Sequence, residues 1–208
     1  LTEEATDNRR NIKALILTPT RELAIQIDEC FSDYAIHTSL RHTVIFGGVN
    51  QNPQVRQIKQ GTDILIATPG RLLDLISQGF IHLNNIKHFI LDEADRMLDM
   101  GFIHDIKRIL PLLPKQRHTM LFSATMPSSI AELSRKMLYK PTRVEVAPAS
   151  SVVDTIKQSL FMIEKPEKSK LLLNLLKKEG IKSTLVFSRT KHGADKIAKI
   201  LNKNGIQC

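Results

Sequence analysis

Short apolar runs alternate with longer amphipathic segments through the first part of the chain. A run of three or four apolar residues predicts a buried strand, and such runs stand at residues 14–17, 44–46, 64–67, 89–91 and 119–122. Between them, apolar residues recur at spacings of three and four, which predicts helices over residues 21–35, 55–60, 71–76, 103–110 and 128–138. Regular alternation of apolar strands and helices is typical of a parallel sheet covered on both faces. We therefore expect a doubly wound α/β fold.

Several of the predicted helices carry recognisable end signals. Gly61 and Gly79 are placed to stop the second and third of them, because glycine tolerates the backbone turn that follows a helix. At the start of the last one, Ser128 or Ser129 together with Glu132 predicts a capping box.

The alternation breaks at a run of small residues near position 147 and then begins afresh. We expect a first domain over residues 1–147, a linker over 148–153 and the beginning of a second domain over 154–208. In that second part the pattern predicts strands at 156–163 and 184–187 and helices at 167–178 and 191–202.

Charge and composition narrow the class of partner. The 208 residues carry a formal net charge of +9, which suits a polyanion such as nucleic acid, although a solvated lysine surface gives the same count. No apolar stretch approaches the roughly 20 residues that span a bilayer, so no membrane partner is expected. Cys30 and Cys208 stand alone, and the histidines show no ligand spacing with Cys or Asp. These features favour a reducing, cytoplasmic location over a disulfide framework or a zinc site.

Three carboxylates, Asp92, Glu93 and Asp95, follow directly after the apolar run at residues 89–91. Carboxylates at the end of a buried strand can present oxygen ligands to Mg²⁺ and orient an attacking water for phosphoryl transfer. Taken alone, they fit equally well the start of a helix, where negative charge is favoured by the helix dipole.

Other polar segments follow the neighbouring strands. Pro19-Thr20-Arg21, Gly47-Gly48 and Thr68-Pro69-Gly70-Arg71 combine free backbone amides, glycines and a guanidinium, which together suit phosphate groups. Ser123-Ala124-Thr125 follows the strand after the acidic residues, where a polar strand end with a helix cap is the plainer interpretation. For the Pro-Gly pair alone, a simple turn is the plainer interpretation.

In this order, the segments from Pro19 through Ala24, from Thr68 through Arg71, from Asp92 through Phe102 and from Ser123 through Thr125 resemble the DEAD-box family of ATP-dependent RNA helicases. Among its bacterial members the RhlE-like group is the expected relative. The resemblance implies a RecA-like domain followed by the start of a second RecA-like domain.

The same resemblance implies ATP and Mg²⁺ as cofactors, with Asp92, Glu93 and Asp95 near the nucleotide. Asp92 stands where such proteins hold Mg²⁺, directly or through water, and Glu93 is the expected general base. Asp95 is expected to pair with Ser123 and Thr125 and to link hydrolysis to strand separation.

The family also implies RNA as the partner, bound through its backbone without reading base order. The expected contacts are Pro19, Thr20, Arg21, Gly47, Gly48, Thr68, Pro69, Gly70 and Arg71, with Ser188 and Arg189 from the second part. For Ser188 and Arg189, a solvated loop is an equally simple interpretation.

No GxxxxGK[ST] phosphate loop occurs in the sequence. The 208 residues alone are therefore expected to hydrolyse little or no ATP. Since the strand before that loop is central in the family's sheet, its absence is expected to leave a gap with unpaired backbone groups. A non-catalytic RNA-binding or annealing module and, less favoured, a related helicase acting on DNA remain open. A monomer is expected.

Overall fold

The computed structural model describes residues 10–146, 157, 159–177, 181 and 183–208. The chain divides into two compact units, Leu1–Ser151 and Val152–Cys208, and each is described by itself. The expected linker, residues 148–153, lies outside the described residues.

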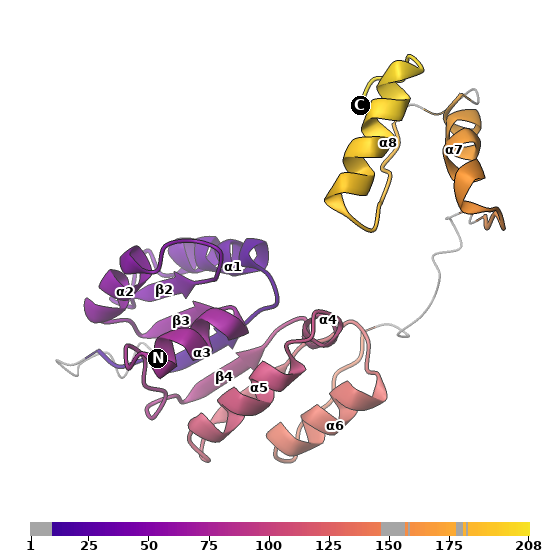
Figure 1. Cartoon of the computed structure of the whole chain (residues 1–208). Helices are drawn as coiled ribbons and strands as arrows, with labels where there is room; N and C mark the ends of the chain where they lie inside the picture. Colours follow the sequence, from indigo (N-terminus) through magenta and orange to yellow (C-terminus); the bar gives the residue numbers. More distant parts are fainter. Residues whose placement is uncertain (1–9, 147–156, 158, 178–180, 182) are drawn as a thin grey trace. The chain divides into compact units, whose positions relative to one another are not determined.

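The first unit is built on a parallel sheet, as predicted. Within its described part the strands are β1 (Ala14–Leu17), β2 (His42–Ile45), β3 (Ile64–Ala67), β4 (His88–Leu91) and β5 (His118–Leu121). They form one five-stranded sheet in the order β2-β3-β1-β4-β5 (Figure 1). Every neighbouring pair is parallel and hydrogen-bonded, so the expected gap is not found among these strands. The α/β prediction is confirmed.

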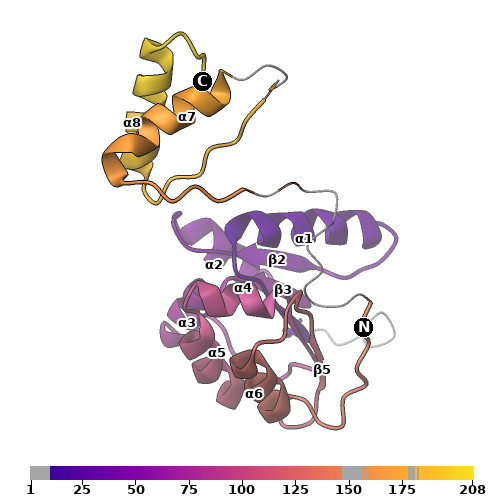
Figure 2. The ribbon, with the colours of Figure 1, turned by 90° about the vertical axis from the view of Figure 1, so that its right-hand side faces the viewer.

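Helices cover the sheet and carry the chain from one strand to the next. They are α1 (Arg21–Tyr34), α2 (Asn52–Lys59), α3 (Pro69–Ser77), α4 (Ala94–Asp99), α5 (Ile103–Ile109) and α6 (Ser128–Met137), with a 3₁₀ turn at Leu110–Leu112. Helices α3, α5 and α6 follow one another along the same face (Figure 2). Gly61 and Gly79, at φ values of +88° and +77°, follow α2 and α3 in the left-handed geometry that such helix ends require.

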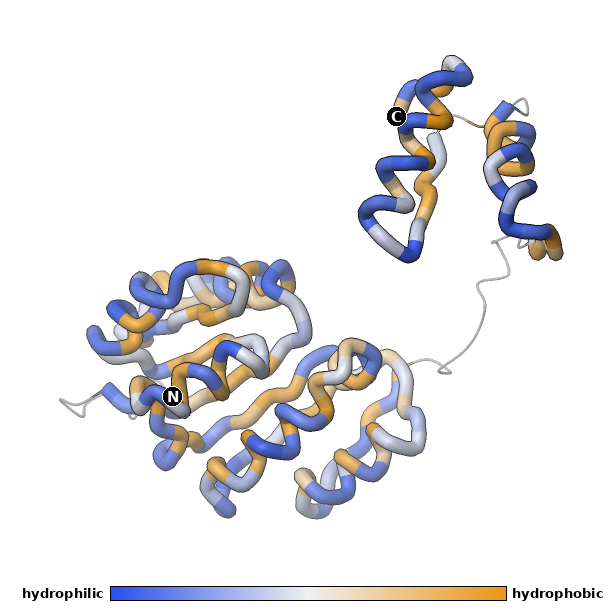
Figure 3. The backbone as a smooth tube through the Cα atoms, in the orientation of Figure 1, coloured by the Kyte–Doolittle hydropathy of each residue, from blue (hydrophilic) through white to orange (hydrophobic). Residues whose placement is uncertain are grey.

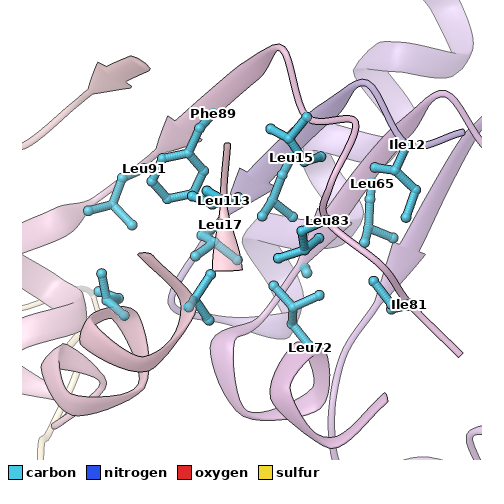
Figure 4. Close-up of a cluster of buried hydrophobic side chains, with 14 of the residues drawn as sticks. Ile12, Leu15, Leu17, Leu65, Leu72, Ile81, Leu83, Phe89, Leu91 and Leu113 are labelled. Carbon is cyan, nitrogen blue, oxygen red and sulfur yellow. The ribbon is translucent and has the colours of Figure 1, made fainter. Parts of the chain in front are cut away.

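Successive strand residues point to opposite faces, and this separates two hydrophobic clusters. Leu15 and Leu17 of β1 face the larger cluster, which α2 to α6 cover and which Figure 4 shows in close-up. Ala14 and Ile16 face the smaller cluster, which includes Ala24, Ile27 and Phe31 of α1. Apolar residues run through the sheet (Figure 3), and its strands β1 and β3 are apolar throughout. The packed sheet is thus a rigid base for the loops that follow its strands.

The register of the sheet aligns the ends of its strands. Leu17 of β1 stands opposite Ala67 of β3 on one side and Leu91 of β4 on the other. The next residues, Thr18, Thr68 and Asp92, continue this alignment, since their amides donate to the last carbonyls of the adjacent strands at 2.9–3.1 Å. Segments that are far apart in sequence therefore leave the sheet at one level.

The expected capping box at α6 is wrong. The helix begins at Ser128 after Pro127, and no side chain caps it. Glu132 lies too far into the helix to reach back to the first turn, and instead accepts from Lys136 one turn later at 2.5 Å. Acceptance from Lys136 lowers the pKa of the exposed Glu132 carboxyl.

The second unit contains α7 (Lys168–Leu176), preceded by a 3₁₀ turn at Lys165–Glu167, and α8 (Lys191–Lys203). Both helices were predicted. The strands predicted at residues 156–163 and 184–187 are not formed in the parts of them that the structure describes, residues 157, 159–163 and 184–187. A strand needs a neighbour to take its backbone hydrogen bonds, and these two segments do not pair. Throughout the described chain, no helix combines the length and apolar character needed to cross a membrane.

Candidate functional site

Asp92 begins the acidic turn at the end of β4. Its amide donates to the carbonyl of Leu17 at 2.9 Å, and its Oδ1 accepts from the Glu93 amide at 2.9 Å. Burial raises the pKa of the Asp92 carboxyl; the Glu93 amide works against this, and the Glu93 charge adds to it. An ionised carboxylate in such a place gains from a nearby cation. Asp92 therefore fits a Mg²⁺ ion, which proteins often hold through one or two carboxylates, waters and phosphates.

Glu93 turns the chain sharply from β4 into α4. Its backbone is left-handed, with φ 49° and ψ 52°, a conformation that costs a non-glycine residue about 1–2 kcal/mol. The following amide, of Ala94, donates to the carbonyl of Phe122 at 3.0 Å. The Glu93 carboxylate accepts from Arg96 at 3.0 Å on the helix surface. The turn thus directs two adjacent carboxylates away from the strand.

Asp95 is tied to the segment after β5 by a closed set of hydrogen bonds. Its Oδ2 accepts from the Thr125 hydroxyl at 2.7 Å and from the Thr125 amide at 2.8 Å. Its own amide donates to Ser123 Oγ at 3.1 Å, and that hydroxyl donates to the Thr125 carbonyl at 2.7 Å. Burial acts to raise the pKa of Asp95, but donation from Thr125, Ser123 and the Arg96 amide outweighs it and holds the pKa below its usual range.

The segment after β1 opens helix α1. Thr20 caps that helix, its Oγ1 accepting from the Leu23 amide at 3.3 Å. The next residue, Arg21, is exposed, and its guanidinium lies over the Phe46 ring at 4.9 Å. An exposed cation therefore stands at a helix start, beside the end of β2.

Glycines give the neighbouring loops an open surface. Gly47 and Gly48 are exposed after β2, and Gly70 is exposed at the start of α3. A Cβ atom built on any of the three would meet no atom within 4 Å. Gly48 also needs to be glycine because its φ is +79°. Here a ligand backbone can approach the protein backbone closely.

Arg71 does not reach into this open surface. Its side chain is 10% exposed and lies near Asp74, at 3.7 Å. Its guanidinium donates to Gln54 Oε1 at 3.0 Å and to the Val49 carbonyl at 2.9 Å. The expectation that Arg71 meets phosphate directly thus conflicts with a guanidinium that is turned inward and already paired.

Three residues that the sequence did not single out also belong to this region. Gln54 is buried and bonded to the backbone of Phe46, and Phe46 lies under Arg21. Thr18, at the end of β1, is buried, and its hydroxyl finds no partner among the residues that the structure describes. No spacing rule marks Gln54 or Phe46, because their roles depend on contacts between separate elements. For Thr18, the position directly after a central strand was the available signal.

The sheet order places these segments in a row along one edge of the sheet, the edge formed by the carboxyl ends of its strands. The glycine loop follows β2, Thr68 follows β3, Pro19 lies just beyond β1, the acidic turn follows β4 and Ser123 follows β5. Neighbouring strands lie about 4.8 Å apart, so the row extends over roughly 20 Å. One half carries glycines, a helix start and Arg21, and the other half carries the carboxylates with their hydroxyl partners. The halves meet where β1 and β4 are paired.

In the second unit, Ser188 and Arg189 are exposed in the turn before α8. Thr190 caps that helix through its Oγ1, which accepts from the Gly193 amide at 3.1 Å. A Cβ on Gly193 would clash with Ser188 Oγ, so this turn packs tightly against the helix start.

The chain is similar to known proteins in both sequence and fold. Residues 1–133 match the family described as DEAD/DEAH box helicase. This chain belongs to that family. It is 41% identical over 195 residues to the ATP-dependent RNA helicase RhlB of Shewanella baltica (strain OS155), covering 93% of this chain and 44% of the relative. It is 39% identical over 199 residues to the ATP-dependent RNA helicase DeaD of Buchnera aphidicola (subsp. Acyrthosiphon pisum, strain APS), covering 94% of this chain and 33% of that protein.

A solved structure agrees with the fold. The crystal structure of a DEAD box protein from the hyperthermophile Methanococcus jannaschii matches with a TM-score of 0.63 and 38% identity, over 94% of this chain and 52% of that one. The RecA-like assignment is confirmed. The chain spans about half or less of the length of these relatives. The relatives cited are named RhlB and DeaD, so an RhlE-like character stays a prediction.

Proposed function

We propose that this chain supplies the nucleotide-facing acids and much of the RNA-binding surface of an ATP-dependent RNA helicase. The observation that carries the proposal is the single row at the sheet edge, where phosphate-binding features adjoin paired carboxylates on one rigid base. The relatives named ATP-dependent RNA helicase support the same activity.

At the acidic half, Asp92 would hold Mg²⁺ directly or through water. A bound Mg²⁺ would supply positive charge opposite the phosphates, and Asp92 is the residue of this chain that would hold it. Glu93 would orient the attacking water and accept its proton, since it follows Asp92 and leads out of the strand. Asp95, with Ser123 and Thr125, would transmit changes at the acids to the segment after β5.

At the other half, RNA would be bound by its backbone. Arg21 would meet a phosphate, and the open glycine surfaces would accept the close approach of sugar and phosphate. The remaining proposed contacts are Thr20, the exposed Gly47, Gly48 and Gly70, and Ser188 and Arg189 from the second unit. Pro19, Thr68 and Pro69 are buried, so they would shape the backbone of this surface and not present side chains to RNA. Preference for RNA over DNA would come from 2′-hydroxyl contacts and A-form shape. A monomeric, cytoplasmic protein stays the expectation.

The test is RNA-stimulated ATP hydrolysis by this chain joined to the remaining helicase segments of an RhlB relative. We expect turnover that needs RNA and Mg²⁺ and that falls by at least about a hundredfold in Glu93→Gln, the usual scale for loss of a general base. Asp99→Asn is the matched control, because Asp99 is an exposed acid at the end of α4, the short helix that begins directly after Glu93. RNA binding without turnover in the parent protein would favour the non-catalytic binding module.

A further inference from the structure

Gln54 of α2 is buried, with 7% of its surface exposed, and its carboxamide extends the edge strand β2 by one residue. Its Oε1 accepts from the Phe46 amide at 3.3 Å, and its Nε2 donates to the Phe46 carbonyl at 3.2 Å. The side chain thereby does what a neighbouring strand would do for Phe46. The glycine loop begins at the next residue.

Arg71 fastens the other side of the same loop. Its guanidinium donates to the Gln54 oxygen at 3.0 Å and to the carbonyl of Val49 at 2.9 Å. Gln54 Oε1 is thus shared between Phe46 and Arg71, and the loop is held at both ends, at Phe46 and at Val49. Between these anchors lie Gly47 and Gly48, which have no side chains to hold them.

The anchor at Phe46 reaches a third segment as well. The Phe46 ring lies under the guanidinium of Arg21 at 4.9 Å, a distance at which cation and ring attract. The loops after β1, β2 and β3 are therefore connected through one buried carboxamide and one ring.

We infer that Gln54 and Arg71 are positioning residues that fix the glycine loop for RNA and do not themselves contact it. The inference rests on the proposed RNA binding at this edge. It changes the role that the sequence suggested for Arg71 from a phosphate ligand to a clamp. Two independent features support it. The Arg71 side chain is only 10% exposed, and the two groups that accept from it are the Val49 carbonyl of the loop and the Gln54 carboxamide that holds Phe46.

The first test measures how the affinity for a fluorescent oligouridylate depends on salt, for the 208-residue chain and its variants. Each phosphate contact contributes about 0.7 to the slope of log K against log salt for a single strand. Arg71→Met and Gln54→Met should each weaken binding, by roughly tenfold if one to two hydrogen bonds of the loop are lost, and should leave the slope unchanged. The double variant should be little weaker than either single one, because both act on one loop.

Arg71→Lys separates the two roles. A lysine keeps the charge but lacks the planar fork that spans Gln54 and Val49, so as a clamp it should bind RNA as poorly as Arg71→Met. Arg56→Met and Gln57→Met are matched controls, since both residues are exposed on α2, and they should bind like the parent chain. A slope that falls by about 0.7 in Arg71→Met and is restored in Arg71→Lys would overturn the inference and leave RNA binding intact.

Amide hydrogen exchange without RNA tests the clamp independently. The Phe46 amide is the donor to Gln54, and the Val49 carbonyl accepts from Arg71. In Gln54→Met, exchange at Phe46 should accelerate by roughly tenfold or more while the amides within β1 and β3 keep their protection. Unchanged exchange at Phe46 would overturn the clamp. If the chain bound no RNA although exchange responded as expected, the proposed function would fail and the clamp would stand as a structural feature.

Discussion

Glu93 shows how one residue can be kept in an unfavourable backbone conformation at the sharp turn between β4 and α4. Its φ of 49° is rare for a residue with a Cβ, and glycine adopts this geometry without the clash. We therefore expect Glu93→Gly to be more stable than Glu93→Ala by about 1 kcal/mol. Urea unfolding of the two variants measures the difference. At Asp99, in ordinary helical geometry within α4, alanine should be the more stable by about 0.5–1 kcal/mol. Equal stabilities at position 93 would mean that the left-handed turn is not maintained.

The closed hydrogen-bond set of Asp95, Ser123 and Thr125 joins two elements, the turn after β4 and the segment after β5. These bonds lower the pKa of Asp95 in the folded state. The free energy by which they stabilise the fold is therefore fully present when the pH is above the pKa of the unfolded chain, about 3.9. This free energy is lost as the pH falls through the lower pKa of the folded state. We expect Thr125→Val to cost about 1 kcal/mol at neutral pH, the usual scale for one hydrogen bond, and progressively less in acid.

A double-mutant cycle with Asp95→Asn measures this link between elements directly. The coupling between Asp95 and Thr125 should be about 1 kcal/mol at neutral pH and should decline as the pH falls through the lowered pKa of Asp95. Asp105 and Arg108 provide a control on the surface of α5, where the carboxylate and guanidinium lie 3.6 Å apart. Their coupling should stay within about 0.5 kcal/mol. A coupling of Asp95 and Thr125 no larger than that of the control would contradict a built link between the two segments.

The bounds predicted for the strands of the first unit agree with the structure to within two residues, because each strand is a short apolar run between helical patterns. Because each polar segment was placed directly after a predicted strand, the same alternation also implies that these segments lie at the carboxyl ends of parallel strands. The sequence did not predict the contacts of Gln54 with Phe46 and Arg71, because these depend on where α2 packs. Gln54 looks like any polar helix residue, and Arg71 looks like a free cation, until the fold brings them together. In the second unit, apolar runs predicted strands, but a run becomes a strand only when another one pairs with it.

For the whole 208-residue chain, we expect RNA binding without ATP hydrolysis. The chain carries +9 and exposes Arg21 with three glycines, so RNA should bind with an affinity that falls steeply with salt and varies little with base order. Yet the 208 residues contain no GxxxxGK[ST] loop to hold the β and γ phosphates, so hydrolysis of ATP should be negligible even with RNA and Mg²⁺ present.

Two assays on the isolated chain separate these halves of the prediction. Oligouridylate and a mixed-sequence RNA should compete with similar affinity, and release of phosphate from ATP should match the rate without protein. Glu93→Gln should change neither result, since a general base contributes nothing where the phosphates are not held in line with it. Magnesium-dependent turnover that disappears in Glu93→Gln would show instead that other residues of this chain hold the phosphates.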